Sequence, residues 1–314
     1  MIPKIIFIVP YRNRPHHQHF FNTYIQHILE DYPANYCKVY FIEQNNQHER
    51  FNRGAVKNIG FMAMKELYPK NYKNITFVFN DVDTIPYKKN ILQYETTTGI
   101  IKHFYGKRFA MGGIFSITGG DFEKIEGFSN YWTWGHEDVV IVKRAEKHKI
   151  RIDRSIYFEM GDINIIHLNN DRTRGLDIST SFLVDDDPLN TINIIMNLKY
   201  TVYDNNTIHS NFIYIDHFDL ALEKRIFDYV IDYDKGKEHY LKTFGELKEQ
   251  HKKKYGTGNK YVINTEIIGA KEHLLKHHFD LSLLNKNMKT NKVRNNSVAR
   301  NNSVMAKMVM MPKK

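Results

Sequence analysis

The stretch Ile75-Thr-Phe-Val-Phe-Asn-Asp-Val-Asp83 decides the fold that we expect for this chain. Its first five residues are apolar or β-branched, as in a buried strand, and two carboxylates, Asp81 and Asp83, follow almost at once. Open α/β sheets bind ligands beyond the carboxyl ends of their strands. Because side chains alternate along an extended strand end, both carboxylates point to the same side. The stretch therefore predicts a hard-oxygen site for Mg²⁺ or Mn²⁺ that leaves positions open for a diphosphate.

Strand-like and helix-like segments alternate upstream of this stretch. Short apolar runs over residues 4–9 and 38–43 predict strands. Residues 15–29 and 52–67 carry apolar side chains at helical spacing. Alternation of this kind builds a parallel sheet with helices on its faces.

Downstream, the same patterns predict a catalytic domain over 1–218, a helical appendage over 219–284 and a disordered basic tail over 285–314. The elements expected in the first domain are strands over 108–118, 151–158 and 163–168, helices over 120–130 and 139–148, and peripheral strands over 192–203 and 212–215. The helices expected in the appendage are 220–233, 238–255 and 266–284.

Charge and composition exclude several classes of protein. The net charge is +10, but eight basic residues and no acidic one follow Asp280, so the rest of the chain carries only about +2. A nucleic-acid groove needs basic charge on a folded face, so we expect no nucleic-acid partner, whereas the tail is either solvated or contacts an acidic partner. No apolar run approaches the roughly 18 residues of a membrane-spanning helix. The single cysteine, Cys37, forms no internal disulfide, so we expect a soluble protein of the reducing cytoplasm.

The loop Tyr131-Trp-Thr-Trp-Gly-His-Glu-Asp138 is the most unusual segment of the chain. An aromatic plane covers the apolar face of a sugar, and a neighbouring carboxylate accepts hydrogen bonds or a proton from its hydroxyls. The alternative is that Trp132 and Trp134 anchor the core and that Glu137 and Asp138 start a helix, where acids favour the dipole. Both interpretations can hold, since a base at a helix N-terminus stays ionised.

Five blocks in matching order resemble the β-1,4-galactosyltransferases and their relatives with the GT-A fold. The blocks are Val9-Pro-Tyr-Arg-Asn-Arg14, Phe51-Asn-Arg53, Phe79-Asn-Asp-Val-Asp83 with Pro86, Gly112-Gly113, and Trp132-Thr-Trp-Gly-His-Glu-Asp138. The likeness covers about residues 4–170 and continues more faintly to 218. It implies a Rossmann-like mixed sheet flanked by helices. It also implies metal-dependent, inverting transfer of a hexose or N-acetylhexosamine from a UDP-sugar to a saccharide hydroxyl.

The resemblance also implies roles for individual residues. Asp138 would be the catalytic base, and Glu137 and Trp134 would bind the acceptor. Guanidinium groups suit phosphate oxygens and an aromatic ring suits a base. The residues implied to bind the nucleotide sugar are Pro10, Arg12, Arg14, Phe51, Arg53, Asp81 and Gly113.

The cofactor implied by the resemblance is Mn²⁺ or Mg²⁺, held by Asp83, His167 and Asn164. The family has a Met-x-x-His pair where this chain has Asn164-Ile-Ile-His167, so Asn164 replaces a thioether, and Asn169 is an alternative third ligand. An oxygen ligand favours Mn²⁺ or Mg²⁺ over softer ions.

Two further departures bear on substrate and activity. His136 replaces the second glycine of the aromatic loop. Ala110 stands where galactose-transferring members usually have tyrosine, which leaves room for a 2-acetamido group. The resemblance therefore leaves the donor open between galactose and N-acetylgalactosamine, with glucose-type sugars as a further alternative. Residues 170–180 do not identify the acceptor. The departures keep a second hypothesis open, a catalytically inactive carbohydrate-binding or scaffold protein with the same fold.

Overall fold

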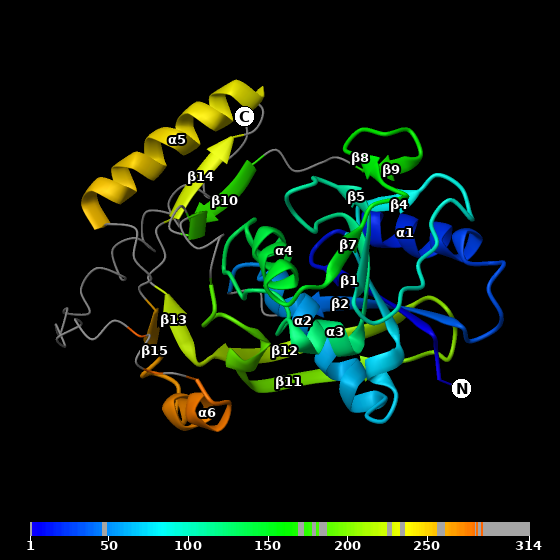
Figure 1. Ribbon diagram of the computed structural model, residues 1–314, viewed down its shortest axis with the longest axis horizontal. Coiled ribbons are helices and arrows are strands. Elements are labelled where there is room, and N and C mark those ends of the chain that lie inside the picture. The colour runs from blue at the N-terminus through cyan, green and yellow to red at the C-terminus, as the bar shows by residue number, and fades with distance from the viewer. Residues whose placement is uncertain are drawn as a thin grey trace, which may run out of the picture.

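A mixed sheet forms the centre of the computed structural model (Figure 1). The structure describes residues 2–45, 49–168, 173–177, 180–181, 187–224, 228–232, 236–255, 261–279, 281 and 284. Within these residues the sheet has nine strands in the order β11-β12-β2-β1-β3-β6-β5-β7, with β8 paired to β5. Its strands are β1 (Ile5–Tyr11), β2 (Cys37–Gln44), β3 (Thr76–Asn80), β5 (Ile100–Gly106), β6 (Ile114–Thr118), β7 (Arg151–Asp153), β8 (Phe158–Glu159), β11 (Ile195–Tyr203) and β12 (Asn211–Leu220).

Three two-stranded ribbons and six α-helices surround this sheet in the described residues. The ribbons join β4 (Thr84–Pro86) to β9 (Ile165–His167), β10 (Thr173–Asp177) to β14 (Asp228–Asp232), and β13 (Leu222–Lys224) to β15 (Tyr261–Ile263). The helices are α1 (Pro15–Ile28), α2 (Arg53–Leu67), α3 (Gly119–Lys124), α4 (Glu137–Lys147), α5 (Gly236–Tyr255) and α6 (Ala270–Lys276).

The sheet combines parallel and antiparallel pairs, and β11 runs antiparallel to β12 at one edge. Strands β12, β2, β1 and β3 are mutually parallel, and β6 runs antiparallel between β3 and β5. The carboxyl end of β3 therefore meets the beginning of β6 at one edge. The fold class is the one expected, a mixed α/β sheet flanked by helices.

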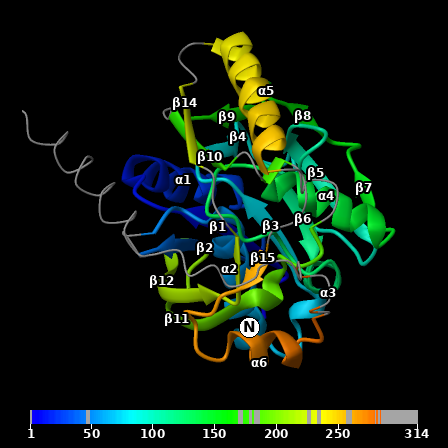
Figure 2. The same ribbon diagram turned by 90° about the vertical axis from the view of Figure 1, so that its left-hand side faces the viewer.

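Helices cover both faces of the sheet because the central strands are apolar on both sides. Ile5 and Phe7 of β1 pack in one hydrophobic cluster with Phe21 of α1. The alternate residues, Ile6 and Ile8, pack in the other cluster with residues of α2, α3 and α4. Strands buried on both faces read as continuous apolar runs, as the parallel strands do here. Figure 2 shows α1 separated from α2 and α3 by the central strands.

The strand and helix predictions for residues 4–83 are confirmed. The strands predicted over 192–203 and 212–215 correspond to β11, at the edge of the sheet, and to its neighbour β12. The helix predicted over 220–233 is wrong, because the described residues there form the end of β12, then β13 and β14. The sequence Asp228-Tyr-Val-Ile-Asp232 is rich in β-branched and aromatic residues, which favour a strand, and five residues fit either periodicity.

Two parts of the predicted domain plan remain open. Leu222, Tyr261 and Leu274, all in the predicted appendage, are buried in the same hydrophobic cluster as α2. The division at 218 therefore stays a prediction. The predicted tail over 285–314 lies outside the described residues, and so does Asn169. None of the helices in the described ranges is long and apolar enough to cross a lipid bilayer.

Candidate active site

The Asp-Val-Asp motif lies just beyond the carboxyl end of β3, held in place by backbone hydrogen bonds. The amide of Asp81 donates to the carbonyl of Gly113 at 2.9 Å, which extends the β3–β6 pairing by one residue. The Asn80 side chain donates to the carbonyls of Asp81 and Thr84, both at 2.8 Å, and so closes the turn. The strand end therefore fixes both carboxylates.

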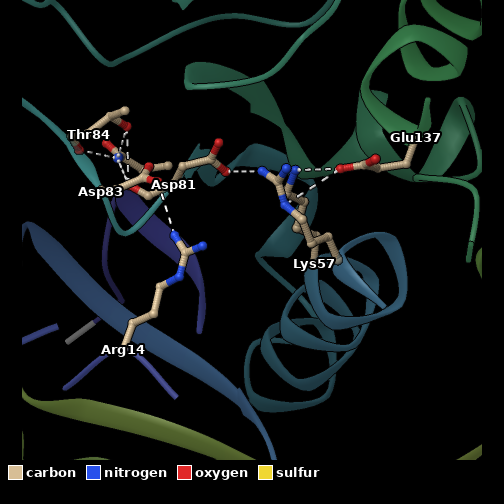
Figure 3. A network of polar contacts seen from close by, with 8 residues as sticks. Arg14, Lys57, Asp81, Asp83, Thr84 and Glu137 are labelled. Atoms are coloured by element: carbon tan, nitrogen blue, oxygen red, sulfur yellow. Dashed lines mark hydrogen bonds and ion pairs between the residues drawn. The ribbon is translucent and has the colours of Figure 1, made fainter. Parts of the chain in front are cut away.

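Each carboxylate of the motif pairs with an arginine. Arg53 Nη2 donates to Asp81 Oδ1 at 2.6 Å, and Arg14 Nη1 donates to Asp83 Oδ2 at 3.2 Å. Arg53 is the first residue of α2, and Arg14 precedes α1. Figure 3 shows Arg14 reaching toward the motif from one side and the group around Lys57 and Glu137 on the other.

The two carboxylates differ in acidity. Burial opposes ionisation of Asp81, but the charges of Arg53 and Lys57 outweigh it and lower the pKa of Asp81. Burial, followed by the negative charge of Asp81, raises the pKa of Asp83 despite the nearby His167. A cation placed at Asp83 would remove this penalty, so the pair suits a divalent ion.

A cavity of about 120 Å³ opens in front of the motif. It brings together two loops that follow β1 and β2, the end of β3 and the aromatic loop before α4. Its lining combines arginines and aromatic rings with the two carboxylates of the motif. The lining residues are Pro10, Arg12, Arg14, Phe51, Arg53, Asp81, Val82, Asp83 and Trp134. All except Val82 are predicted site residues.

The aromatic loop divides its two tryptophans between core and cavity. The Trp132 ring stacks on Phe218 of β12, with ring centroids 5.2 Å apart and planes at 11°. Trp134 lines the cavity. The core interpretation thus fits Trp132, and the binding interpretation fits Trp134.

Glu137 belongs to a buried ion network at the start of α4. Glu137 Oε1 lies 3.6 Å from Lys57 Nζ and 3.8 Å from Arg53 Nε (Figure 3). The side chains of Glu137 and Lys57 are each 2% exposed. Lys57 Nζ also lies 4.6 Å from the centre of the Phe128 ring. The predicted contact of Glu137 with an acceptor stays a prediction, and its observed partners are these two cations.

Asp138 lies in the first turn of α4 against the Gly-Gly segment. Its carbonyl accepts a hydrogen bond from the Met111 amide at 2.8 Å. A Cβ added to Gly112 would stand 3.0 Å from Asp138 Oδ2, so the absent side chain makes room for this carboxylate. Gly113 has a φ of +72°, and a Cβ there would stand 2.5 Å from the Tyr105 carbonyl oxygen. Both glycines are therefore required by the geometry around Asp138 and Asp81.

The pKa of Asp138 is raised to about 6, first by burial and then by the negative charge of the neighbouring Glu137. Arg53 and Lys57 lower it, and Asp81 raises it. Asp138 thus shares an electrostatic environment with the Asp-Val-Asp motif although it is not in the cavity lining. A carboxylate with a pKa near 6 is mostly ionised at neutral pH and can accept a proton.

His167 lies beside Asp83 through the β4–β9 ribbon. Thr84 pairs with His167, and the Leu168 amide donates to the Asp83 carbonyl at 2.8 Å. The Tyr105 hydroxyl lies 2.9 Å from His167 Nδ1, so Nε2 is the nitrogen suited to a metal. One carboxylate and one imidazole therefore come together from separate strands.

Asn164 lies at the opposite end of the same ribbon. Its carbonyl accepts from the Tyr87 amide at 2.7 Å, and its side-chain amide donates to Asp162 at 3.0 Å. The geometry thus gives Asn164 a local role in the turn before β9. Within the described residues, no group of three or more His, Cys, Asp or Glu side chains forms a metal site. Asp83 and His167 stay the predicted pair of metal ligands, and Asn164 stays the predicted third.

Two functional features escaped sequence reasoning. Lys57 lies on the buried side of α2, although a lysine within an apolar helical pattern is usually predicted to face solvent. Its spacing from Arg53, four residues along a helix, was the available signal, because such residues share a face. Gly112 was recognised as part of the Gly-Gly block, but its contact with Asp138 joins segments 26 residues apart.

Comparison with known families agrees with this geometry. Residues 2–95 match the model for the N-terminal region of glycosyl transferase group 7. Residues 97–167 match the model described as the N-terminal domain of galactosyltransferase. The chain belongs to the β-1,4-galactosyltransferase family. The two matched segments of this family member contain every predicted site residue, from Pro10 to His167.

Individual relatives support the same family. The chain is 31% identical over 166 residues to beta-1,4-galactosyltransferase 4 of Mus musculus, covering 49% of this chain and 45% of that protein. It is 29% identical over 184 residues to the Homo sapiens protein of the same name, covering 54% of this chain and 50% of that protein. The matches therefore span about half the length of these relatives.

A solved structure supports the fold. The catalytic domain of Drosophila beta-1,4-galactosyltransferase 7, in complex with xylobiose, superposes with a TM-score of 0.53 at 19% identity, covering 74% of this chain and 97% of that one. A mutant of the same protein, in complex with manganese, UDP-Gal and xylobiose, gives a TM-score of 0.52 at 18% identity with the same coverage.

Proposed function

We propose that this family member is a metal-dependent, inverting glycosyltransferase that moves galactose or N-acetylgalactosamine from a UDP-sugar to a saccharide hydroxyl. The observation that carries the proposal is the cavity that joins three arginines and Phe51 to the Asp-Val-Asp motif and Trp134. A nucleoside diphosphate needs cations for its phosphates and an aromatic surface for its base, and this cavity offers both. The Drosophila relative crystallised with UDP-Gal and manganese supports the same donor class.

The donor end of the cavity would hold the nucleotide. Burial lowers the pKa of Arg12, yet an arginine stays protonated at any physiological pH, so its charge remains available to a phosphate. Arg14 now pairs with Asp83, and a diphosphate bound there would share the same guanidinium. Phe51 lies at the edge of the core and lines the cavity, where it can contact the uracil ring.

The donor set beside the motif fits a hard divalent cation. Asp83 supplies a carboxylate and His167 an imidazole, and the raised pKa of Asp83 indicates a charge in need of compensation. Mn²⁺ or Mg²⁺ bound there would neutralise the charge that develops on the departing diphosphate.

Asp138 is the residue that we propose as catalytic base. It would take the proton from the acceptor hydroxyl while that oxygen forms its bond to the anomeric carbon and the bond from that carbon to UDP breaks. The reaction inverts the anomeric centre, because attack and departure occur on opposite faces of the sugar ring. The positive charges of Arg53 and Lys57 lower the pKa of Asp138 and so favour its ionised form in this buried position. Trp134 would cover the apolar face of the acceptor.

The choice between the two donors depends on Ala110. Its side chain is buried, with 3% of its surface exposed, and it precedes Met111, whose amide bonds to Asp138. A short side chain at this position supports a donor with a 2-acetamido group and does not exclude galactose.

The test is a panel of UDP-sugars with saccharide acceptors, assayed for released UDP and for product by mass spectrometry. We expect release from UDP-Gal or UDP-GalNAc in the presence of Mn²⁺ and loss of release with EDTA. Absence of metal-dependent release with every donor, together with retained saccharide binding, would favour the inactive carbohydrate-binding or scaffold protein.

A further inference from the structure

The aromatic loop that carries Trp134 and Asp138 is fixed from both ends by one segment, residues 187–190. At the first residue of the loop, the Tyr131 hydroxyl donates to Asp187 Oδ2 at 2.5 Å. After the loop, Arg144 of α4 donates to the carbonyls of Asp187 and Asn190 at 2.8 and 2.9 Å. The segment therefore bridges the entry and the exit of the loop.

Tyr261 of β15 completes this arrangement from a distant part of the chain. Its hydroxyl donates to the same Asp187 Oδ2 at 3.0 Å and accepts a hydrogen bond from Asn190 Nδ2 at 2.9 Å. Asn190 Oδ1 in turn accepts from the amide of Asn130 at 2.8 Å. Tyr261 thus contacts both residues of the segment whose side chains hold the start of the loop.

These groups are almost completely shielded from water. Asp187 is 2% exposed, Tyr131 4% and Tyr261 3%. A hydrogen bond to a buried carboxylate is stronger than one between neutral groups. Removing one donor therefore leaves the buried charge of Asp187 with fewer hydrogen bonds to stabilise it. The position of Tyr261 is itself fixed by the sheet. Its strand β15 pairs with β13, and β13 follows β12 of the central sheet along the chain (Figure 1).

We infer that Tyr261, through Asp187 and Asn190, is a positioning residue for the aromatic loop. The hydroxyl lies outside the residues matched by the family models, so the C-terminal part of this chain takes part in arranging the site. The inference about loop position is independent of the reaction, whereas its kinetic consequence rests on the proposed function.

The test uses the two tryptophans of the chain, both of which lie in this loop at positions 132 and 134. Their fluorescence reports on the loop alone. In the full chain, Tyr261→Phe should shift the emission to the red and increase quenching by acrylamide. The kcat for sugar transfer should fall about tenfold with the KM for the UDP-sugar unchanged, since a displacement of about 1 Å can cost roughly a hundredfold.

Tyr40→Phe is the matched control. The Tyr40 hydroxyl donates to Asp204 Oδ2 at 2.7 Å, and the side chain is fully buried in β2. This variant should lose stability to a similar degree but keep the tryptophan signal and kcat. Asp187→Ala should disturb the signal more than Tyr261→Phe, and Asp187→Asn, which keeps an acceptor oxygen, should restore part of it.

Unchanged emission and quenching in Tyr261→Phe, measured below its unfolding temperature, would overturn the inference. An equal change in Tyr40→Phe would do the same, because the effect would then be a general loss of packing. Failure to detect any sugar transfer would count against the proposed function and would leave the fluorescence result to decide the inference.

Discussion

Replacing Asp138 by asparagine should slow sugar transfer about 10²–10⁴-fold and at the same time stabilise the folded chain. Asp138 has a pKa of about 6 in the fold, raised first by burial and then by Glu137, against 3.8 for an ordinary aspartate. The folded state therefore binds a proton more tightly than the unfolded state does. The contribution of Asp138 to the free energy of unfolding therefore falls as the pH rises from about 4 through 6.

The magnitude follows from the two pKa values. At about 1.4 kcal/mol per tenfold change in proton affinity, the gap between 3.8 and about 6 corresponds to roughly 3 kcal/mol above pH 7. An asparagine has nearly the same shape but no charge to desolvate. We expect Asp138→Asn to raise the free energy of unfolding by up to this amount at pH 8 and to add almost nothing at pH 4.

Urea unfolding of the wild type and the variant at pH 8, 6 and 4 measures this difference, and UDP release measures activity. General-base catalysis contributes about 10²–10⁴-fold, so transfer should fall by that factor. An Asp138→Asn variant that is less stable than wild type at pH 8, or equally different at all three pH values, would refute the burial argument. Near-full activity would refute the role as base.

Three further outcomes follow from the same contacts. The rate of transfer should fall by about 90% between pH 7 and pH 5 as Asp138 takes up a proton, and a pH–rate profile that is flat over this range would contradict this. In Glu137→Gln the fall should occur at lower pH, because the Glu137 charge raises the pKa of Asp138. Gly113→Ala should destabilise the fold by about 2 kcal/mol or more, because φ is +72° and the new Cβ would lie 2.5 Å from the Tyr105 carbonyl oxygen. A chemical denaturation midpoint equal to that of wild type would be inconsistent with this clash. Lys57→Met should lower the free energy of unfolding by about 3 kcal/mol in the same assay, because the buried Glu137 charge would have one cation fewer beside it. The double variant Lys57→Met, Glu137→Gln should recover part of this loss, whereas additive losses would argue against an interaction between Lys57 and Glu137.

The sequence was most informative where one physical requirement dominates a segment. Strands β1, β2 and β3 are buried on both faces, so their apolar runs identify them without any knowledge of neighbours. Asp81 and Asp83 stood out for the same reason, since charged residues directly after a buried strand need a partner or a ligand.

Features that depend on distant contacts could not be read in this way. The buried side chain of Lys57 faces Glu137, which lies 80 residues further along the chain and supplies an opposite charge. Asp187 ends the run Asp185-Asp-Asp187, and such acidic runs are typical of solvated loops. Here two tyrosine hydroxyls donate to Asp187, which is buried. Asn164 matches a family position by spacing, and its role as third metal ligand stays a prediction; its side-chain nitrogen donates to Asp162 in the turn before β9.

The central claim is that Asp83 and Asp138 serve one site with separate tasks. Calorimetric titration of UDP in the presence of Mn²⁺ into wild type, Asp83→Asn and Asp138→Asn, with UDP release measured on the same samples, tests it most directly. The account predicts that Asp138→Asn binds UDP as wild type does but releases it from the donor about 10²–10⁴-fold more slowly, and that Asp83→Asn loses the manganese-dependent binding. Unchanged UDP affinity in Asp83→Asn, or full turnover in Asp138→Asn, would contradict it.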